Sequence, residues 1–263
     1  EQHEIDEVLA RARRLGAATW VIRALFNAAF VHVEFGDLAT GEAVLDEMES
    51  FDLNDFEASE ARFARAHIAV IREGTPEQLQ EYWEAVSIWY DSQDAQLQAS
   101  THGFKAGVKA LEGDFGASFE HALLDPSSEG VLSATMASLA TADPTRITRT
   151  REFADGVLAA DGRLRTLVSL LLDAGAAAVS GDTPAATGHF VEALALADEV
   201  VGPLWLVLIQ ALAHGMVGDA HPAAAAAGRD AAGWLRDHGF RRWEVVLADH
   251  LPSEDVATAT ETA

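Results

Sequence analysis

The stretch "EFGDLATGEAV", residues 34–44, interrupts a helical pattern with a Gly-Asp pair and places a second small residue five positions after that glycine. The same arrangement returns in "EGDFGASF" (112–119), "SGDTPAATG" (180–188) and "VGDAHPAAA" (217–225). In each copy an alanine lies seven residues before the glycine: Ala29, Ala106, Ala174 and Ala211. The small residues after it are Gly41, Ser118, Ala186 and Ala223. Four copies of one spacing predict a repeated structural unit.

Each part of this pattern has a physical reason. Glycine adopts the left-handed conformation that ends a helix at little cost. The aspartate after it is expected to accept hydrogen bonds from the free amides of the next helix, as an N-cap does. The alanine and the later small residue are expected to face each other where the two helices cross, because small side chains let helix axes approach closely. Each unit is therefore predicted to be a helical hairpin with a tight crossing.

Predicted helix ends fall at positions 36, 74, 113, 143, 181 and 218, so the intervals are 38, 39, 30, 38 and 37 residues. In "GTPEQ" (74–78) Thr75 and Gln78 predict a capping box, and Asp143-Pro144 predicts a similar helix start. Apolar residues recur three and four positions apart, and no segment is typical of a strand. The predicted helices are 4–15, 18–35, 38–51, 56–73, 76–91, 95–112, 115–124, 130–141, 145–160, 163–180, 184–200, 203–217, 220–237 and 241–249.

The regular period predicts an all-α fold, a right-handed α-solenoid of about six to seven antiparallel helix pairs. We expect one helical-repeat domain over residues 1–251 and a polar tail over 252–263. The short fourth interval predicts an irregular unit near residue 143.

Composition limits the possible functions. The 263 residues are 49% apolar and include no cysteine, which excludes disulfides, thiolate metal sites and cysteine nucleophiles. The net charge of −24 predicts no direct binding to nucleic acid or to anionic membranes. The acidity itself is interpreted first as genomic bias, with attraction of basic partners as the alternative. No apolar run reaches the ~18 residues of a membrane span, and the acidic start does not resemble a signal peptide. We expect a cytoplasmic chain and, because it begins with Glu1, a fragment with neighbouring domains.

The Gly-Asp turns and small crossing residues resemble those of the tetratricopeptide family, whose repeat is about 34 residues long. The stretch 9–37, "LARARRLGAATWVIRALFNAAFVHVEFGD", is also similar to helical-repeat regions of large bacterial ATP-dependent LuxR-type regulators of the maltose-activator kind. It is similar as well to such regions in actinobacterial adenylate cyclases that contain an AAA-type ATPase. These resemblances imply a sensing or protein-binding role that controls a neighbouring ATPase. The chain has no G-x4-G-K-[ST] loop of its own.

Two helical faces are candidates for a binding groove. The tetratricopeptide resemblance implies an inner surface with Arg23, Phe26, Phe30 and Glu34 early and Trp205, Leu208 and Leu212 late. The positions five before, one before and three after each crossing alanine form another face, which includes both lysines of the chain and the isolated Asp173. A buried unpaired charge is costly, so this face should meet water, a partner or a ligand. Which face lines the groove remains open; the candidate residues are Arg23, Phe26, Phe30, Lys105, Asp173, Trp205, Gln210 and His214.

Three other stretches are interpreted mainly as structural. The arginines of 143–151 are expected to pair with the chain's own carboxylates, with an anion-binding patch as the alternative. The aromatic residues of "YWEAVSIWY" (82–90) are expected in the core, with a peptide-binding ledge as the alternative. The acidic run 46–60 is expected to be a solvated helix end and linker rather than a cation site.

Two functional hypotheses follow. The first is an interaction and sensing module that binds a peptide, a protein segment or a small inducer in a concave groove. The second is an all-α enzyme or small-molecule binder with a polar pocket around Lys105, Asp173 and His214. The sequence contains no recognisable catalytic motif, so we expect no enzyme activity, cofactor or metal. An open groove would favour the first hypothesis, and a closed cavity with converging titratable groups the second.

Overall fold

The computed structural model describes residues 2–87, 89, 95–159, 162–219 and 221–253. Within these ranges 83% of residues are helical and no strand occurs, which confirms the all-α prediction. The described elements are α1 (Gln2–Leu15), α2 (Ala18–Glu34), α3 (Leu38–Glu49), α4 (Asp55–Arg72), α5 (Pro76–Ser87), α6 (Ala95–Glu112), α7 (Phe115–Ala122), α8 (Ser128–Ala140), α9 (Pro144–Val157), α10 (Arg163–Ser180), α11 (Thr183–Val200), α12 (Pro203–Val217), α13 (Pro222–Asp237), α14 (Arg241–Val246) and a 3₁₀ turn (Ala248–His250). Each predicted helix matches one of these elements. Parts of the predicted helices 76–91, 145–160 and 220–237 and of the tail 252–263 lie outside the described residues.

Three of the four Gly-Asp turns have the predicted geometry. Gly36, Gly113 and Gly181 have φ of 85°, 86° and 81°. In the first turn the Gly36 amide donates to the Val33 carbonyl at 2.9 Å, and the Asp37 amide donates to the His32 carbonyl at 2.8 Å. The aspartate carboxylate in each of these turns then accepts from the amide three residues on, so these three aspartates are N-caps. The capping box of Thr75 and Gln78 is also present.

The fourth Gly-Asp turn differs from the prediction. Gly218 has ψ of −174°, so the chain leaves the helix end extended, and α13 begins only at Pro222. Asp219 is therefore not the N-cap; its carboxylate lies 3.0 Å from Nε2 of His214. The N-cap is His221, whose Nδ1 accepts from the Ala223 amide at 3.3 Å. The prediction that Asp219 caps the next helix is wrong, because Pro222, three residues further on, shifts the helix start.

The crossing alanines are fully buried in all four hairpins: Ala29, Ala106, Ala174 and Ala211 are at most 1% exposed. A Cβ on Gly41 would lie 3.3 Å from the Ala29 carbonyl oxygen, which shows how closely the backbones approach. In the fourth hairpin Ala223 is only half-buried, and the close approach occurs at Gly228 instead. A Cβ there would lie 2.5 Å from Cγ of His214.

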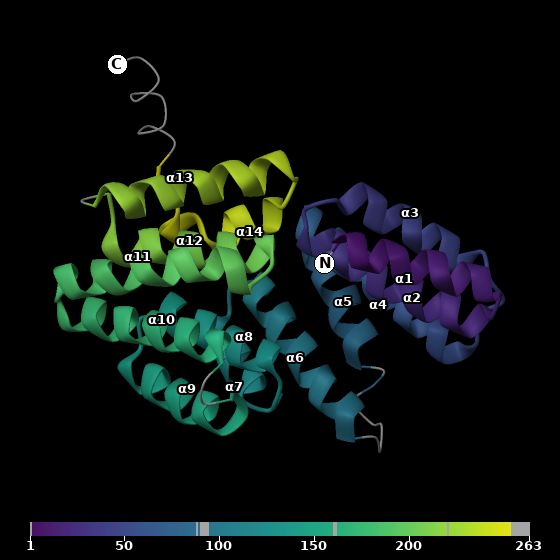
Figure 1. Ribbon diagram of the computed structural model, residues 1–263, viewed down its shortest axis with the longest axis horizontal. Coiled ribbons are helices and arrows are strands. Elements are labelled where there is room, and N and C mark those ends of the chain that lie inside the picture. Colours follow the sequence, from purple (N-terminus) through teal and green to yellow (C-terminus); the bar gives the residue numbers. More distant parts are fainter. Residues whose placement is uncertain (1, 88, 90–94, 160–161, 220, 254–263) are drawn as a thin grey trace, which may run out of the picture.

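The last helices return to the first ones. In Figure 1, α1–α5 lie on one side of the molecule, α7–α13 on the other, and α6 and α14 lie between them. Helix α12 contacts α2 and α8, and α14 contacts α4 and α6. Arg242 of α14 donates to the Leu111 carbonyl and packs on Gly74, where any Cβ would overlap its side chain. Residues as distant as Leu9 and Leu247 belong to one hydrophobic cluster.

Ion pairs account for the arginine-rich stretch. Arg146, Arg149 and Arg151 pair with Asp143, Glu120 and Asp173, as expected for pairing within the chain. The interpretation of 46–60 as a solvated run is partly wrong, because Glu60 is 4% exposed and pairs with Arg23. Two other carboxylates of that run, Asp46 and Glu49, pair with Arg65 of α4.

The aromatic stretch 82–90 contributes to the core. Tyr82, Val86 and Trp89 are at most 5% exposed, which agrees with the expected role in packing. Trp83 is half-buried, and Tyr90 lies outside the described residues.

Candidate functional site

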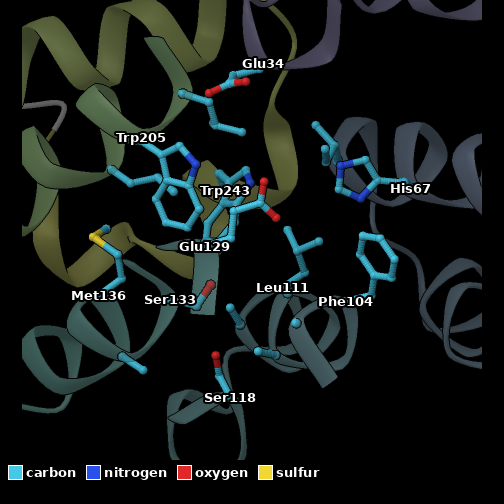
Figure 2. Close-up of a pocket in the computed structure, with 18 of the residues that line it drawn as sticks. Glu34, His67, Phe104, Leu111, Ser118, Glu129, Ser133, Met136, Trp205 and Trp243 are labelled. Atoms are coloured by element: carbon cyan, nitrogen blue, oxygen red, sulfur yellow. The ribbon is translucent and has the colours of Figure 1, made fainter. Parts of the chain in front are cut away.

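A cavity of about 240 Å³ lies where the early and late helices meet. Its walls come from α2, α4 and α5, from α6, α7 and α8, and from α12 and α14. Figure 2 shows Trp205 and Trp243 in one part of the cavity and His67 and Phe104 in another. The lining is mostly apolar and aromatic, which is usual for a site that binds a small molecule.

The cavity exists because α6 presents small residues to it. Gly103, Ala106, Gly107 and Ala110 line it from this helix. A Cβ on Gly107 would meet no atom within 4 Å, so the space beside it is empty of protein. Glycine in a helix interior costs about 1 kcal/mol relative to alanine. Gly107 therefore lowers the stability of α6. A larger side chain at this position would take up part of the cavity volume.

The aromatic wall is built from residues of three helices. Phe30 of α2 stacks on Phe63 of α4 with ring centroids 5.4 Å apart, and Phe63 lies 4.5 Å from the Phe104 ring of α6. Phe30 and Phe104 line the cavity, whereas Phe63 is fully buried behind them. Contacts of this kind fix the positions of the lining rings.

Two polar side chains in the wall bond to each other. Nδ1 of His67 lies 2.7 Å from the Tyr82 hydroxyl. Burial lowers the pKa of His67 to about 4, and it also raises the pKa of Tyr82. Both groups are therefore neutral near pH 7, because the low-dielectric surroundings disfavour their charged forms.

Glu129, in the first turn of α8, projects into the cavity (Figure 2). Burial raises its pKa, and the neighbouring charge of Asp125 raises the pKa further. Glu129 is solvent-exposed and also lines the cavity, so its carboxylate is only partly surrounded by protein. Among the described residues no cation or hydrogen-bond donor pairs with its carboxylate.

A second carboxylate, that of Glu34, lines the same cavity. It packs against Gly202 at the start of α12, where a Cβ would lie 2.0 Å from Oε1 of Glu34. A helix N-terminus favours a negative charge, so this carboxylate has a structural role at α12.

The eight residues predicted for the groove do not form one site. Phe30 and Trp205 line the cavity, and Phe26 supports Phe30 edge-on, with ring centroids 5.1 Å apart. Arg23 lies outside the cavity, where it pairs with Glu60 and lies over the rings of Phe26 and Phe56.

The other four lie on the face defined by the crossing alanines, and none of them lines the cavity. Lys105 is buried with Nζ 4.9 Å from the Trp83 ring centroid, and Asp173 pairs with Arg151 at 2.7 Å. His214 is buried, with Nδ1 2.8 Å from the His250 carbonyl oxygen, and Gln210 is half-buried on α12.

The polar pocket proposed around Lys105, Asp173 and His214 is thus not assembled, because each side chain has separate partners. Of the two faces left open by the sequence, the cavity takes its residues from the one implied by the tetratricopeptide resemblance: Phe30, Glu34, Trp205, Leu208 and Leu212.

Sequence reasoning missed Glu129, His67, Gly107 and Trp243. Glu129 is easily interpreted as an ordinary acidic residue at a helix start, and Trp243 lies in a segment without a repeat signature. The available signal was the glycine pair of "THGFKAGVKA" (101–110), since two glycines four residues apart weaken a helix and leave one face bare.

Within the described ranges, no cluster of three or more His, Asp or Glu side chains could hold a metal ion. No described helix combines the length and apolar character needed to cross a membrane. Comparison with known proteins finds no matching family model, no similar curated protein and no similar solved structure.

Proposed function

We propose that this chain is the ligand-sensing helical-repeat module of a cytoplasmic bacterial multidomain regulator, and that a small, mainly apolar molecule occupies its central cavity. The observation that supports this most directly is the composition of the wall, which joins α2 and α4 to α12 and α14. A molecule bound there contacts both ends of the helical array, so its binding free energy favours the closed arrangement over any more open one.

The finer architecture is part of the same proposal. We take the hairpins as a right-handed, tetratricopeptide-like α-solenoid whose concave side is filled by α14. The period near 38 residues and three identical Gly-Asp turns support this. Protein partners and neighbouring domains would then bind elsewhere on the repeats, in keeping with the regulator resemblance of residues 9–37.

The size of the cavity favours a small inducer over a peptide. At ~30 Å³ of liquid volume per water, 240 Å³ corresponds to about eight waters, and an apolar cavity of about 150 Å³ is enough to bind benzene. A peptide of several residues does not fit in this space.

An enzyme remains the alternative, because Glu129 has the raised pKa expected of a general acid. A bound molecule that is chemically converted would favour it.

The test is a thermal-shift and calorimetric titration of the whole chain with two small probes, tert-butylbenzene and phenyltrimethylammonium. We expect at least one to bind and to raise Tm in a concentration-dependent way, by mass action. Hydrogen exchange should slow in both α2 and α12 on binding.

Gly107→Leu is the decisive variant, since its side chain fills the cavity without meeting other atoms at Cβ. It should raise Tm and abolish probe binding, so loss of binding cannot be attributed to unfolding. Gly188→Leu is the matched control, because Gly188 is exposed on α11 and a Cβ there also meets nothing within 4 Å. Binding that survives in Gly107→Leu, or the absence of binding by both probes, would overturn the proposal.

A further inference from the structure

The cavity contains a carboxylate whose charge the protein leaves uncompensated. Glu129 has no cation and no hydrogen-bond donor among the described residues, and the neighbouring charge that raises its pKa is another acid, Asp125. Asp125 is 5% exposed and bonds to Ser127, so it supplies no positive charge. A cation bound in the cavity would therefore be the first positive partner of this carboxylate, and exclusion of water by the bound molecule would strengthen their attraction.

The rest of the lining has the same electrostatic character. None of the described residues that line the cavity is lysine or arginine, and His67 is neutral near pH 7. Glu34 adds a second carboxylate, held at the start of α12. No lining side chain would repel a cation, and an anion would find no positive partner.

Aromatic faces add a second attraction for a cation. Trp205, Trp243, Phe30 and Phe104 all line the cavity. The π face of an aromatic ring, that of tryptophan most strongly, attracts ammonium groups, and desolvation increases the effect. A neutral apolar molecule would gain from burial alone and would leave Glu129 without a partner.

We propose, building on the function proposed above, that the cavity is selective for a small organic monocation, a quaternary ammonium or protonated amine with aromatic or branched alkyl groups. Its positive group lies at the Glu129 carboxylate, and its apolar part lies against the tryptophan and phenylalanine rings. The net charge of −24 additionally raises the local concentration of such cations at low ionic strength.

The experiment compares two probes of the same shape, phenyltrimethylammonium and tert-butylbenzene, which differ in charge. Calorimetric titration of the whole chain should give a Kd about tenfold or more lower for the cation, as expected for an ion pair with added cation–π contacts. In Glu129→Gln this preference should fall to about twofold or less, with binding of tert-butylbenzene unchanged within about twofold.

Glu152→Gln is the matched control, because it removes one exposed carboxylate from α9, away from the cavity. It should keep the wild-type preference. The wild-type comparison needs no variant, so it remains decisive even if Glu129→Gln folds poorly.

The outcomes separate the two proposals. Equal or tighter binding of tert-butylbenzene overturns the selectivity for cations and leaves the cavity as a binding site. A preference that persists in Glu129→Gln overturns the assigned role of Glu129. Failure of both probes to bind overturns this inference together with the proposed function.

Discussion

The hairpin crossings and the central cavity are built by opposite rules. At the Ala29, Ala174 and Ala211 crossings, contacts are local and the alanine is at most 1% exposed. At the cavity, contacts join helices from both ends of the chain, and small residues on α6 keep space open instead of closing it. The same residue types therefore serve tight packing in one region and line an open cavity in the other. Only the partner helices distinguish the two uses.

The largest effect should come from overfilling a crossing. Ala174 is 0% exposed. Ala174→Leu should therefore reduce the free energy of unfolding by about 1–3 kcal/mol, and we expect a value in the upper part of this range. Ala176→Leu, on the exposed side of the same helix, should change it by less than about 0.5 kcal/mol. Chemical denaturation of both variants checks this. Equal losses of stability in the two variants would show that the crossing can accommodate a leucine side chain. They would contradict the view that the crossings are closely packed and the cavity is not.

A pH profile should separate the cavity wall from the hairpins. The pKa of His67 is lowered to about 4, below its unfolded value, so the neutral ring adds stability that is complete above pH ~6.5 and is lost as the pH falls. Between pH 7 and pH 5 the wild type should lose on the order of 2 kcal/mol more than His67→Asn, whose amide can still pair with the Tyr82 hydroxyl. Urea unfolding at both pH values measures the difference. Parallel profiles would contradict the assigned burial of His67.

The helix caps provide a smaller comparison, between regular and irregular turns. Asp182→Ala removes an N-cap and should cost about 1 kcal/mol. Asp219→Ala should cost less, because Asp219 caps no helix and is largely exposed. Thermal unfolding of the two variants tests the difference between the third and fourth turns. A larger loss in Asp219→Ala would mean that its contact with His214 holds the fourth turn together.

The smallest effect concerns Glu129 in the ligand-free protein. Folding raises the pKa of Glu129, so the folded protein favours the protonated side chain. The ionised form therefore lowers stability once the pH exceeds the pKa of the unfolded chain. Glu129→Gln should therefore stabilise the protein by a few tenths of a kcal/mol at pH 7, a modest value because the side chain is accessible to solvent within the cavity. The gain should vanish near pH 4. A variant less stable at every pH would contradict the view that this charge is uncompensated.

The sequence could predict the all-helical class and most of the helix ends but not the site, for a physical reason. Helix ends and crossings depend on residues within one hairpin, so a motif such as Gly36-Asp37 with Ala29 and Gly41 is visible as a spacing. The cavity depends on which distant helices meet. No spacing within the chain indicates that Trp243 and Glu129 line the same cavity, or that Gly107 borders empty space rather than a neighbouring helix. Of the two candidate faces, the one implied by the tetratricopeptide resemblance contributes residues to the cavity, since Phe30 and Trp205 line it.

The fourth turn shows the limit even of local patterns. "VGDAHP" matches the other three copies at Gly218 and Asp219, yet Pro222 fixes the helix start three residues later. A consensus that ignores the residue after the motif cannot detect this competition between two N-caps.

The return of α14 to α4 and α6 has a consequence for synthesis. The bond from Arg242 to the Leu111 carbonyl joins residues 131 positions apart, whereas each hairpin closes within its own short stretch. Local contacts form quickly and distant ones slowly, and a nascent chain folds from its N-terminal side. Hairpins can thus form one after another on the ribosome while the space between them stays open to solvent. The wall of the cavity is complete only when α14 has left the exit tunnel, so under the proposed function a small molecule can bind only after α14 has been synthesised and has docked.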